Sequence, residues 1–189
     1  MNNFIFIWIP KCAGTSFVRA LQSVYPNFKI DYNKKEKLSF GTHGHVKIDC
    51  IYKKHELINK RLLCISRNPY DRMVSLFFYL KKRKLHNFND FDKFCEFVCT
   101  NKIPEVGNFN VKGLSQCNPQ FEWVKGIDNV EIFKFEDLKT LFDDFGLKLI
   151  HLNKTDRSKY LDYFKNKKTI ELVNSKYSKD FEYFNYKKM

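Results

Sequence analysis

The sequence contains little glycine and little proline, with 7 and 5 residues of the two types among 189. So few turn-forming residues leave no stretch that would mark a flexible linker, and the length suits one domain with a substantial core. We therefore predict a single domain over residues 1–189. Hydrophobic residues make up 43% of the chain and aromatic residues 17%, a composition that excludes a disordered protein.

Long apolar runs are also missing. No segment reaches the ~18 consecutive apolar residues that a membrane-spanning helix needs. The first apolar run, residues 4–9, is not preceded by the basic leader of a signal peptide. We therefore expect a cytoplasmic protein without a membrane anchor.

Paired cysteine motifs of the CxxC type are absent. Cys64 lies inside an apolar segment, and Cys95 and Cys99 lie one helical turn apart. The full set is Cys12, Cys50, Cys64, Cys95, Cys99 and Cys117. This pattern is typical of small buried side chains in a reducing compartment, and we expect neither a disulfide framework nor a metal site.

Acidic residues are in the minority, which gives the chain a formal net charge of +13. A field of that sign attracts polyanions, and an acidic glycan, anionic lipid or phosphate-rich cofactor would fit it. The lysines are spread along the chain, with runs near 34–37, 81–84 and 165–168. Because a nucleic-acid-binding protein more often gathers its charge in one arm or face, we do not expect nucleic acid as the partner.

The order of apolar and amphipathic segments predicts an α/β fold. Apolar runs predict strands at 4–9, 61–67, 130–135 and 148–152. Amphipathic patterns predict helices at 15–21, from Pro69 to the basic run 81–84, at 90–102, at 136–145 and, as one long helix, at 167–184. Such alternation indicates a mainly parallel central sheet flanked by helices. Ligands of these sheets bind beyond the carboxyl ends of the strands, where the Lys11 loop, Arg67 and Glu136 fall.

The segment Pro-Lys-Cys-Ala-Gly-Thr-Ser, residues 10–16, follows the first predicted strand. Small residues between a strand and a helix let backbone N–H groups face an anion, although an ordinary turn has the same composition. The candidate anion ligands are Ala13, Gly14, Thr15 and Ser16. Lys11 would add a charge that stabilises a bridging oxygen. The segment is no Walker A motif, because GxxxxGK[ST] is absent.

A second candidate site is Arg-Asn-Pro-Tyr-Asp-Arg-Met-Val-Ser, residues 67–75. Arg67 ends a predicted strand, and Pro69 suits the first position of the following helix. Ser75 lies about two turns into that helix. A guanidinium and a hydroxyl so placed would bind a second phosphate. The alternative is that Arg67 forms a surface ion pair and that Ser75 is a solvated helix residue.

His43 and His45 form the third candidate, in Thr-His-Gly-His-Val. On a strand, residues two apart point to one face. Imidazole suits removal of a proton from a hydroxyl group near neutral pH. The alternatives are a pair of metal ligands, with only Asp49 or Cys50 nearby as a third, or hydrogen-bonded structural histidines.

Together, "IPKCAGTSF" and "SRNPYDRMVSLFF" resemble the two signature motifs of sulfotransferases that use 3′-phosphoadenosine 5′-phosphosulfate (PAPS). The resemblance implies a P-loop-like fold in which the 5′-phosphosulfate is bound by Lys11, Gly14, Thr15 and Ser16. It implies that Arg67 and Ser75 bind the 3′-phosphate. His-Gly-His resembles the uronyl 2-O-sulfotransferase branch, in which one such histidine is the base and the acceptors are sugar hydroxyls. The later blocks "NPQFEWV", "VEIFKFEDL", "LKLIHLNKT" and "YSKDFEYFNY" resemble the carbohydrate sulfotransferase group.

The expected function is therefore sulfuryl transfer from PAPS to a hydroxyl-bearing acceptor, in particular a carbohydrate. His45, or else His43, would take the proton while Lys11 stabilises the leaving oxygen. No metal is expected, because the transferred group carries less charge than a γ-phosphoryl group. The alternatives are a P-loop-like kinase or other nucleotide-binding enzyme, and a catalytically inactive module that binds acidic glycan or nucleic acid. The sequence does not indicate an oligomeric state.

Overall fold

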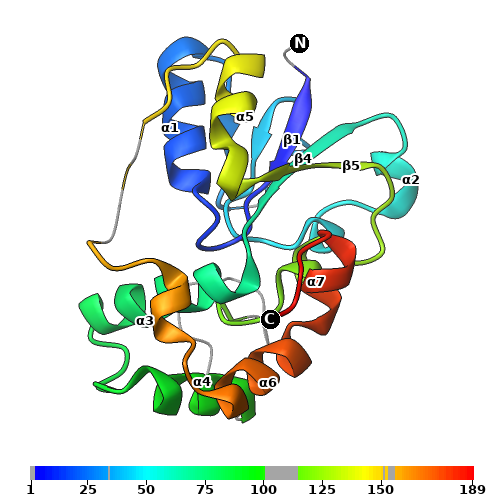
Figure 1. The fold of residues 1–189 in the computed structure, drawn as a ribbon. Coiled ribbons are helices and arrows are strands. Elements are labelled where there is room, and N and C mark those ends of the chain that lie inside the picture. The colour runs from blue at the N-terminus through cyan, green and yellow to red at the C-terminus, as the bar shows by residue number, and fades with distance from the viewer. Residues whose placement is uncertain (1–2, 34, 101–114, 151, 153–155) are drawn as a thin grey trace. The chain divides into compact units, whose positions relative to one another are not determined.

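A computed structural model describes residues 3–33, 35–100, 115–150, 152 and 156–189 (Figure 1). The chain divides into two compact units. The first, here called the sheet unit, consists of Met1–Ser66 and Glu122–Leu152. The second, the helical unit, consists of Arg67–Phe121 and Asn153–Met189. Each unit is described by itself, and the single domain over residues 1–189 stays a prediction.

The sheet unit is built on a parallel sheet with the strand order β2-β3-β1-β4-β5. Every strand pairing in it is parallel, with Phe4 opposite Arg61 and Leu62 opposite Val130. The strands are β1 (Phe4–Ile7), β2 (Lys29–Ile30), β3 (Gly41–Thr42), β4 (Arg61–Ser66) and β5 (Val130–Lys134). The prediction of an α/β fold with a mainly parallel sheet flanked by helices is confirmed.

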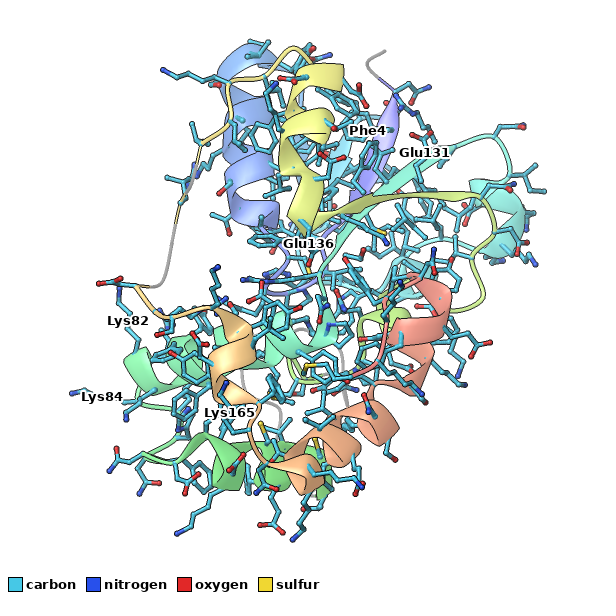
Figure 2. All side chains as sticks on the ribbon, viewed as in Figure 1. Phe4, Lys82, Lys84, Glu131, Glu136 and Lys165 are labelled. Carbon is cyan, nitrogen blue, oxygen red and sulfur yellow. The ribbon has the colours of Figure 1, made fainter. Side chains whose placement is uncertain are left out.

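The apolar composition of β1 and β4 follows from their central positions. All of β1 is buried, as is all of β4 except Arg61, which is what a parallel strand covered on both faces requires. Helices α1 (Gly14–Val24) and α5 (Leu138–Asp144) lie side by side against the sheet (Figure 1). Phe17 of α1 meets Phe142 of α5 with ring centroids 5.8 Å apart. Phe4, labelled in Figure 2, packs edge-on against Phe145 at 5.1 Å.

Shorter elements complete the sheet unit. They are the 3₁₀ helix η1 (Ile48–Cys50), the helix α2 (Lys54–Leu57) and the 3₁₀ helix η3 (Phe135–Asp137). Figure 2 shows Glu136 just after the end of β5. The 3₁₀ helix η2 (Gln120–Trp123) carries the chain from the helical unit back into the sheet unit.

The helical unit packs around the first of its helices, α3 (Pro69–Lys82). Asn68 caps that helix by accepting the Tyr70 N–H at 3.0 Å, and Pro69 stands at its start as predicted. The remaining elements are α4 (Phe91–Thr100), η4 (Tyr160–Tyr163), α6 (Lys167–Lys176) and α7 (Ser178–Tyr183). Their apolar faces form one buried cluster that includes Met73, Phe77, Phe94, Val173 and Phe181.

The predicted strand at 148–152 is wrong for the residues described there. Gly146 ends α5 in the left-handed region (φ 62°), with Leu147 N–H bonded to Phe142 O. The chain then runs past α1, where Leu152 N–H bonds to Ser16 Oγ, and forms no strand in residues 148–150 or at Leu152. A short apolar run does not by itself distinguish a strand from an extended segment. The sheet instead includes β2 and β3, which the sequence analysis missed.

The predicted single helix at 167–184 is also wrong, because the chain breaks at Tyr177 (φ −107°, ψ 23°) into α6 and α7. Two buried contacts explain the break. Tyr177 Oη donates to Cys117 O at 2.8 Å, and Asp180 turns its carboxylate inward to accept backbone N–H groups. These contacts lie about 60 residues away in sequence, so the local pattern could not reveal them. The end of the predicted helix 90–102 lies outside the described residues.

Candidate functional site

The loop that joins β1 to α1 has an unusual backbone. Lys11 (φ 67°) and Ala13 (φ 60°) both lie in the left-handed region, which costs a non-glycine residue about 1–2 kcal/mol. Left-handed residues that alternate with others turn successive N–H groups toward a common point, the geometry of an anion-binding nest. Ala13 O accepts the N–H of Ser16 at 2.9 Å, so the remaining candidates for the anion are the N–H groups of Ala13, Gly14 and Thr15.

Gly14 is explained by a neighbour rather than by its own backbone angles. A Cβ atom at this position would lie 2.2 Å from both Cδ1 and Nε1 of Trp8. Trp8 is a buried residue between β1 and the loop, and its ring also contacts the His45 ring, with centroids 4.8 Å apart. The loop glycine and a candidate catalytic histidine therefore share one aromatic neighbour.

Replacing Gly14 by alanine is expected to destabilise the protein by about 1–3 kcal/mol, because the indole must move to admit the methyl group. Urea unfolding measures the loss. Gly126→Ala is the matched control: Gly126 has a positive φ of 74° but nothing within 4 Å of its added Cβ, so it carries backbone strain without a clash. A Gly14→Ala protein as stable as the wild type would contradict this account of Gly14.

Ser16 already has a structural contact. It is buried, and its Oγ accepts the Leu152 N–H at 3.0 Å. A serine hydroxyl also has one proton to donate. Any contact of Ser16 with a bound anion would use that proton, whereas Thr15, at the loop surface, is half-buried.

His43 is held on both sides. It is buried, its Nδ1 lies 3.2 Å from Asp31 O, and its Nε2 lies 3.1 Å from Tyr52 Oη. A carbonyl oxygen only accepts, so Nδ1 carries the proton and Nε2 faces the tyrosine hydroxyl. Burial lowers the pKa of His43, and the Asp31 carbonyl and carboxylate oppose that shift. These contacts suit a residue that orders its surroundings in the neutral form.

His45 has a different environment. It is half-buried, and its Nδ1 lies 2.8 Å from Trp8 O. The Nδ1–H therefore donates to that carbonyl, which leaves the lone pair of the neutral ring on Nε2. Trp123 Nε1 donates to His45 O at 3.1 Å and fixes the main chain. The two tryptophans thus set the tautomer and the position of this imidazole.

The two histidines do not share the face of a strand, which corrects the sequence prediction. Strand β3 ends at Thr42, and Gly44 between the histidines has φ 68°. This left-handed residue redirects the chain, so the period of two no longer applies. A side chain at position 44 would also approach Tyr32 Cε1 to 2.7 Å.

In the helical unit, the main chain of Arg67 is clamped by a residue that the sequence analysis did not single out. Gln120 accepts the Arg67 N–H and donates to Arg67 O, both at 2.8 Å. The buried Asp180 fixes Gln120 by accepting its backbone N–H at 2.8 Å. Burial raises the pKa of Asp180, and the charge of Arg72 and the N–H donors oppose that rise. The only sequence signal for Gln120 was its place in the "NPQFEWV" block.

Arg67 precedes α3, but its side chain bonds to Asp71 on the face of α3 that also carries Ser75. Arg67 Nε donates to Asp71 Oδ2 at 2.8 Å, and Ser75 stands one turn beyond Asp71. Both Arg67 and Ser75 are buried, so the reading of Ser75 as a solvated helix residue is wrong. A guanidinium bound beside a helix face that carries a hydroxyl can bind one phosphate group together with that hydroxyl.

Other expectations concern metals and thiols. Within the described part of the chain, no group of three or more His, Cys, Asp or Glu side chains is placed to hold a metal ion. Four of the six cysteines are buried as predicted, but Cys50 is exposed. Burial raises the pKa of the Cys99 and Cys117 thiols to about 11. Among the residues described, no helix is both long and apolar enough to cross a membrane.

Comparison with known proteins identifies the fold. A scan against protein-family models finds no match. A search of curated proteins also finds none. Among solved structures, mouse sulfotransferase SULT7A1 complexed with PAP matches over 95% of this chain and 84% of its own, with a TM-score of 0.57 and 12% identity. A sulfotransferase from Alicyclobacillus acidocaldarius matches over 96% and 93%, with a TM-score of 0.49 and 13% identity. The chain thus shares its fold with the mouse protein.

Proposed function

We propose that the protein transfers a sulfuryl group from PAPS to a hydroxyl group of an acceptor. The observation that carries this proposal is the nest-like Lys11 loop directly after β1, at the carboxyl end of a central strand of a parallel sheet. Ligands of such sheets bind at the carboxyl ends of the strands. The fold supports the proposal, because the mouse protein that shares it was solved with PAP, the 3′-phosphoadenosine 5′-phosphate that remains after transfer from PAPS.

The donor ligands proposed here come from both motifs. In the sheet unit, the N–H groups of the loop and the Lys11 ammonium would bind the 5′-phosphosulfate, with the hydroxyls of Thr15 and Ser16 as further donors. In the helical unit, Arg67 and Ser75 would bind the 3′-phosphate. The Gln120 clamp supports the role of Arg67, because it fixes the main chain from which the guanidinium extends.

The chemistry follows from these placements. The acceptor oxygen attacks sulfur in line, the bond from sulfur to the bridging oxygen breaks, and the electron pair stays on the 5′-phosphate of PAP. Lys11 would stabilise the negative charge on that oxygen. His45 would take the acceptor proton on Nε2, because its Nδ1–H is held by Trp8 O. His43, with its ring nitrogens in contact with Asp31 O and Tyr52 Oη, would position this segment.

The finer parts of the proposal concern the acceptor and the compartment. The resemblance of His-Gly-His to the uronyl branch favours a carbohydrate hydroxyl as the acceptor. The net charge of +13 favours an acidic glycan chain as the molecule that carries it. We propose a cytoplasmic location, where free thiols such as Cys50 stay reduced. Incubation with ³⁵S-labelled PAPS and a panel of glycans, tyrosine peptides and phenols tests both the transfer and the acceptor class. Label on peptides alone would refute the carbohydrate acceptor.

Replacing Arg67 by alanine is expected to weaken PAP binding by about 1.5–3 kcal/mol, the scale of a charged hydrogen-bonded contact. Isothermal titration calorimetry with PAP measures the change. Adenosine 5′-monophosphate, which lacks the 3′-phosphate, should bind both proteins alike. Arg19→Ala removes an exposed arginine of α1 and controls for net charge. An Arg67→Ala protein that binds PAP as tightly as the wild type would contradict the assignment.

A further inference from the structure

Asp71, in the first turn of α3, holds a second arginine besides Arg67. Its Oδ2 accepts Arg67 Nε, and its Oδ1 accepts Arg157 Nη2. Arg157 comes from the segment before η4, 86 positions from Asp71 in the chain. A single carboxylate therefore brings two guanidinium groups together within the helical unit.

The charge and burial of these three groups favour an anionic ligand. Two guanidiniums and one carboxylate together carry one net positive charge. The Arg67, Asp71 and Arg157 side chains are only 10%, 13% and 11% exposed. Charged groups so far removed from water are stabilised when a nearby opposite charge balances them. Guanidinium forks match phosphate oxygens in geometry as well as in charge.

The arrangement also brings the Arg157 side chain to the face of α3 that carries Ser75. Asp71 and Ser75 stand four residues apart and so lie on the same face. An arginine bound to Asp71 is thereby brought to the face that carries Ser75. The segment that supplies Arg157 is anchored there too, because Tyr163 of η4 packs edge-on against Phe78 of α3 with ring centroids 5.7 Å apart.

We propose that Arg157 binds the 3′-phosphate of the donor together with Arg67, and that Asp71 orients both guanidiniums for this contact. The inference rests on the proposed function, since it adds a residue to the donor site of that reaction. Nothing in the sequence pattern marked Arg157, because its link to Asp71 is made only in the folded chain.

The test compares PAP with adenosine 5′-monophosphate by calorimetry, using wild type, Arg157→Ala and Arg157→Lys. Alanine should weaken PAP binding by about 10- to 100-fold, the range for hydrogen bonds to a charged group, and leave the monophosphate unchanged. Lysine keeps a cation beside Asp71 but loses the fork, so it should weaken PAP binding by a smaller factor. Arg83→Ala, at the exposed end of α3, controls for the loss of one positive charge and should bind PAP as the wild type does.

The outcomes separate the inference from the function. If wild type binds PAP and Arg157→Ala binds both nucleotides like wild type, the inference is wrong. It is equally wrong if Arg157→Ala weakens both nucleotides by one factor, because that is the result of a purely structural ion pair. Should the alanine variant not fold, Arg157→Lys decides, and wild-type affinity for PAP would overturn the inference. If wild type itself fails to bind PAP, the proposed function falls with it.

Discussion

Replacing His45 by alanine is expected to lower the turnover of sulfuryl transfer by about 10²–10⁴-fold, the usual contribution of a general base. The structure gives the reason, because the Trp8 carbonyl holds Nδ1–H and directs the lone pair of the ring to Nε2. PAP binding should change little, since no phosphate contact is assigned to this ring. Turnover with a fixed acceptor and calorimetry with PAP measure the two quantities on one preparation.

The matched control for this prediction is His43→Ala. That ring contacts Asp31 O and Tyr52 Oη in a buried setting, so its loss should reduce stability and affect turnover less than His45→Ala does. A larger loss of turnover at His43 would exchange the two roles. If neither variant slows transfer, histidine does not act as the base. Activity lost to chelators and restored by zinc would instead make the pair metal ligands.

Replacing Lys11 by alanine is expected to lower kcat by about 10²–10³-fold, the scale of removing one group that stabilises developing charge. The affinity for PAPS, in which the leaving oxygen is still bonded to sulfur, should fall much less. The ammonium interacts most strongly when the sulfur–oxygen bond is breaking, and only interactions that strengthen in the transition state raise kcat. Alanine keeps a side chain at a position with φ 67°, so the backbone requirement of the loop is unchanged.

Single-turnover kinetics and titration with PAPS in the absence of acceptor separate the two effects of the Lys11 substitution. Lys37→Ala is a control, since Lys37 is an exposed lysine of the same unit paired with Glu56. It should leave both kcat and PAPS affinity unchanged. Equal losses of kcat and of affinity in Lys11→Ala would show that Lys11 binds the donor without a special role in bond cleavage.

Local sequence patterns predicted the elements that neighbouring residues determine, and missed the strands that depend on long-range pairing. The segments of β1, β4 and β5 and the start of α3 at Pro69 were all identified. Burial on both faces gives β1 and β4 their apolar runs, and helix capping likewise leaves marks in adjacent residues. β2 and β3 have two residues each, too few to show any period. Their places in the sheet depend on the pairing of β3 with β1 and of β2 with β3, which no local pattern records.

The candidate site likewise has a part that the sequence predicted and a part that only the structure shows. The motifs that contain Lys11 and Arg67 were visible as strand ends followed by helix starts. The contacts that hold the site residues in place were not visible in the sequence. Trp8 contacts His45, and Gln120 contacts Arg67, only across long stretches of chain. Gly14 shows the difference well. The sequence suggested a glycine for a phosphate loop, whereas the structure requires it for the close approach of the Trp8 ring.

The most direct measurement of the central claim is the thermal stability of the wild-type protein with PAP, with ATP and Mg²⁺, and with neither. A ligand that binds only the folded state raises the stability of the protein, by about 2.7 kcal/mol at a concentration 100 times its Kd. We expect PAP to raise the melting temperature and ATP with Mg²⁺ to leave it unchanged. Stabilisation by ATP with Mg²⁺ but not by PAP would contradict a PAPS-dependent sulfotransferase and favour a kinase.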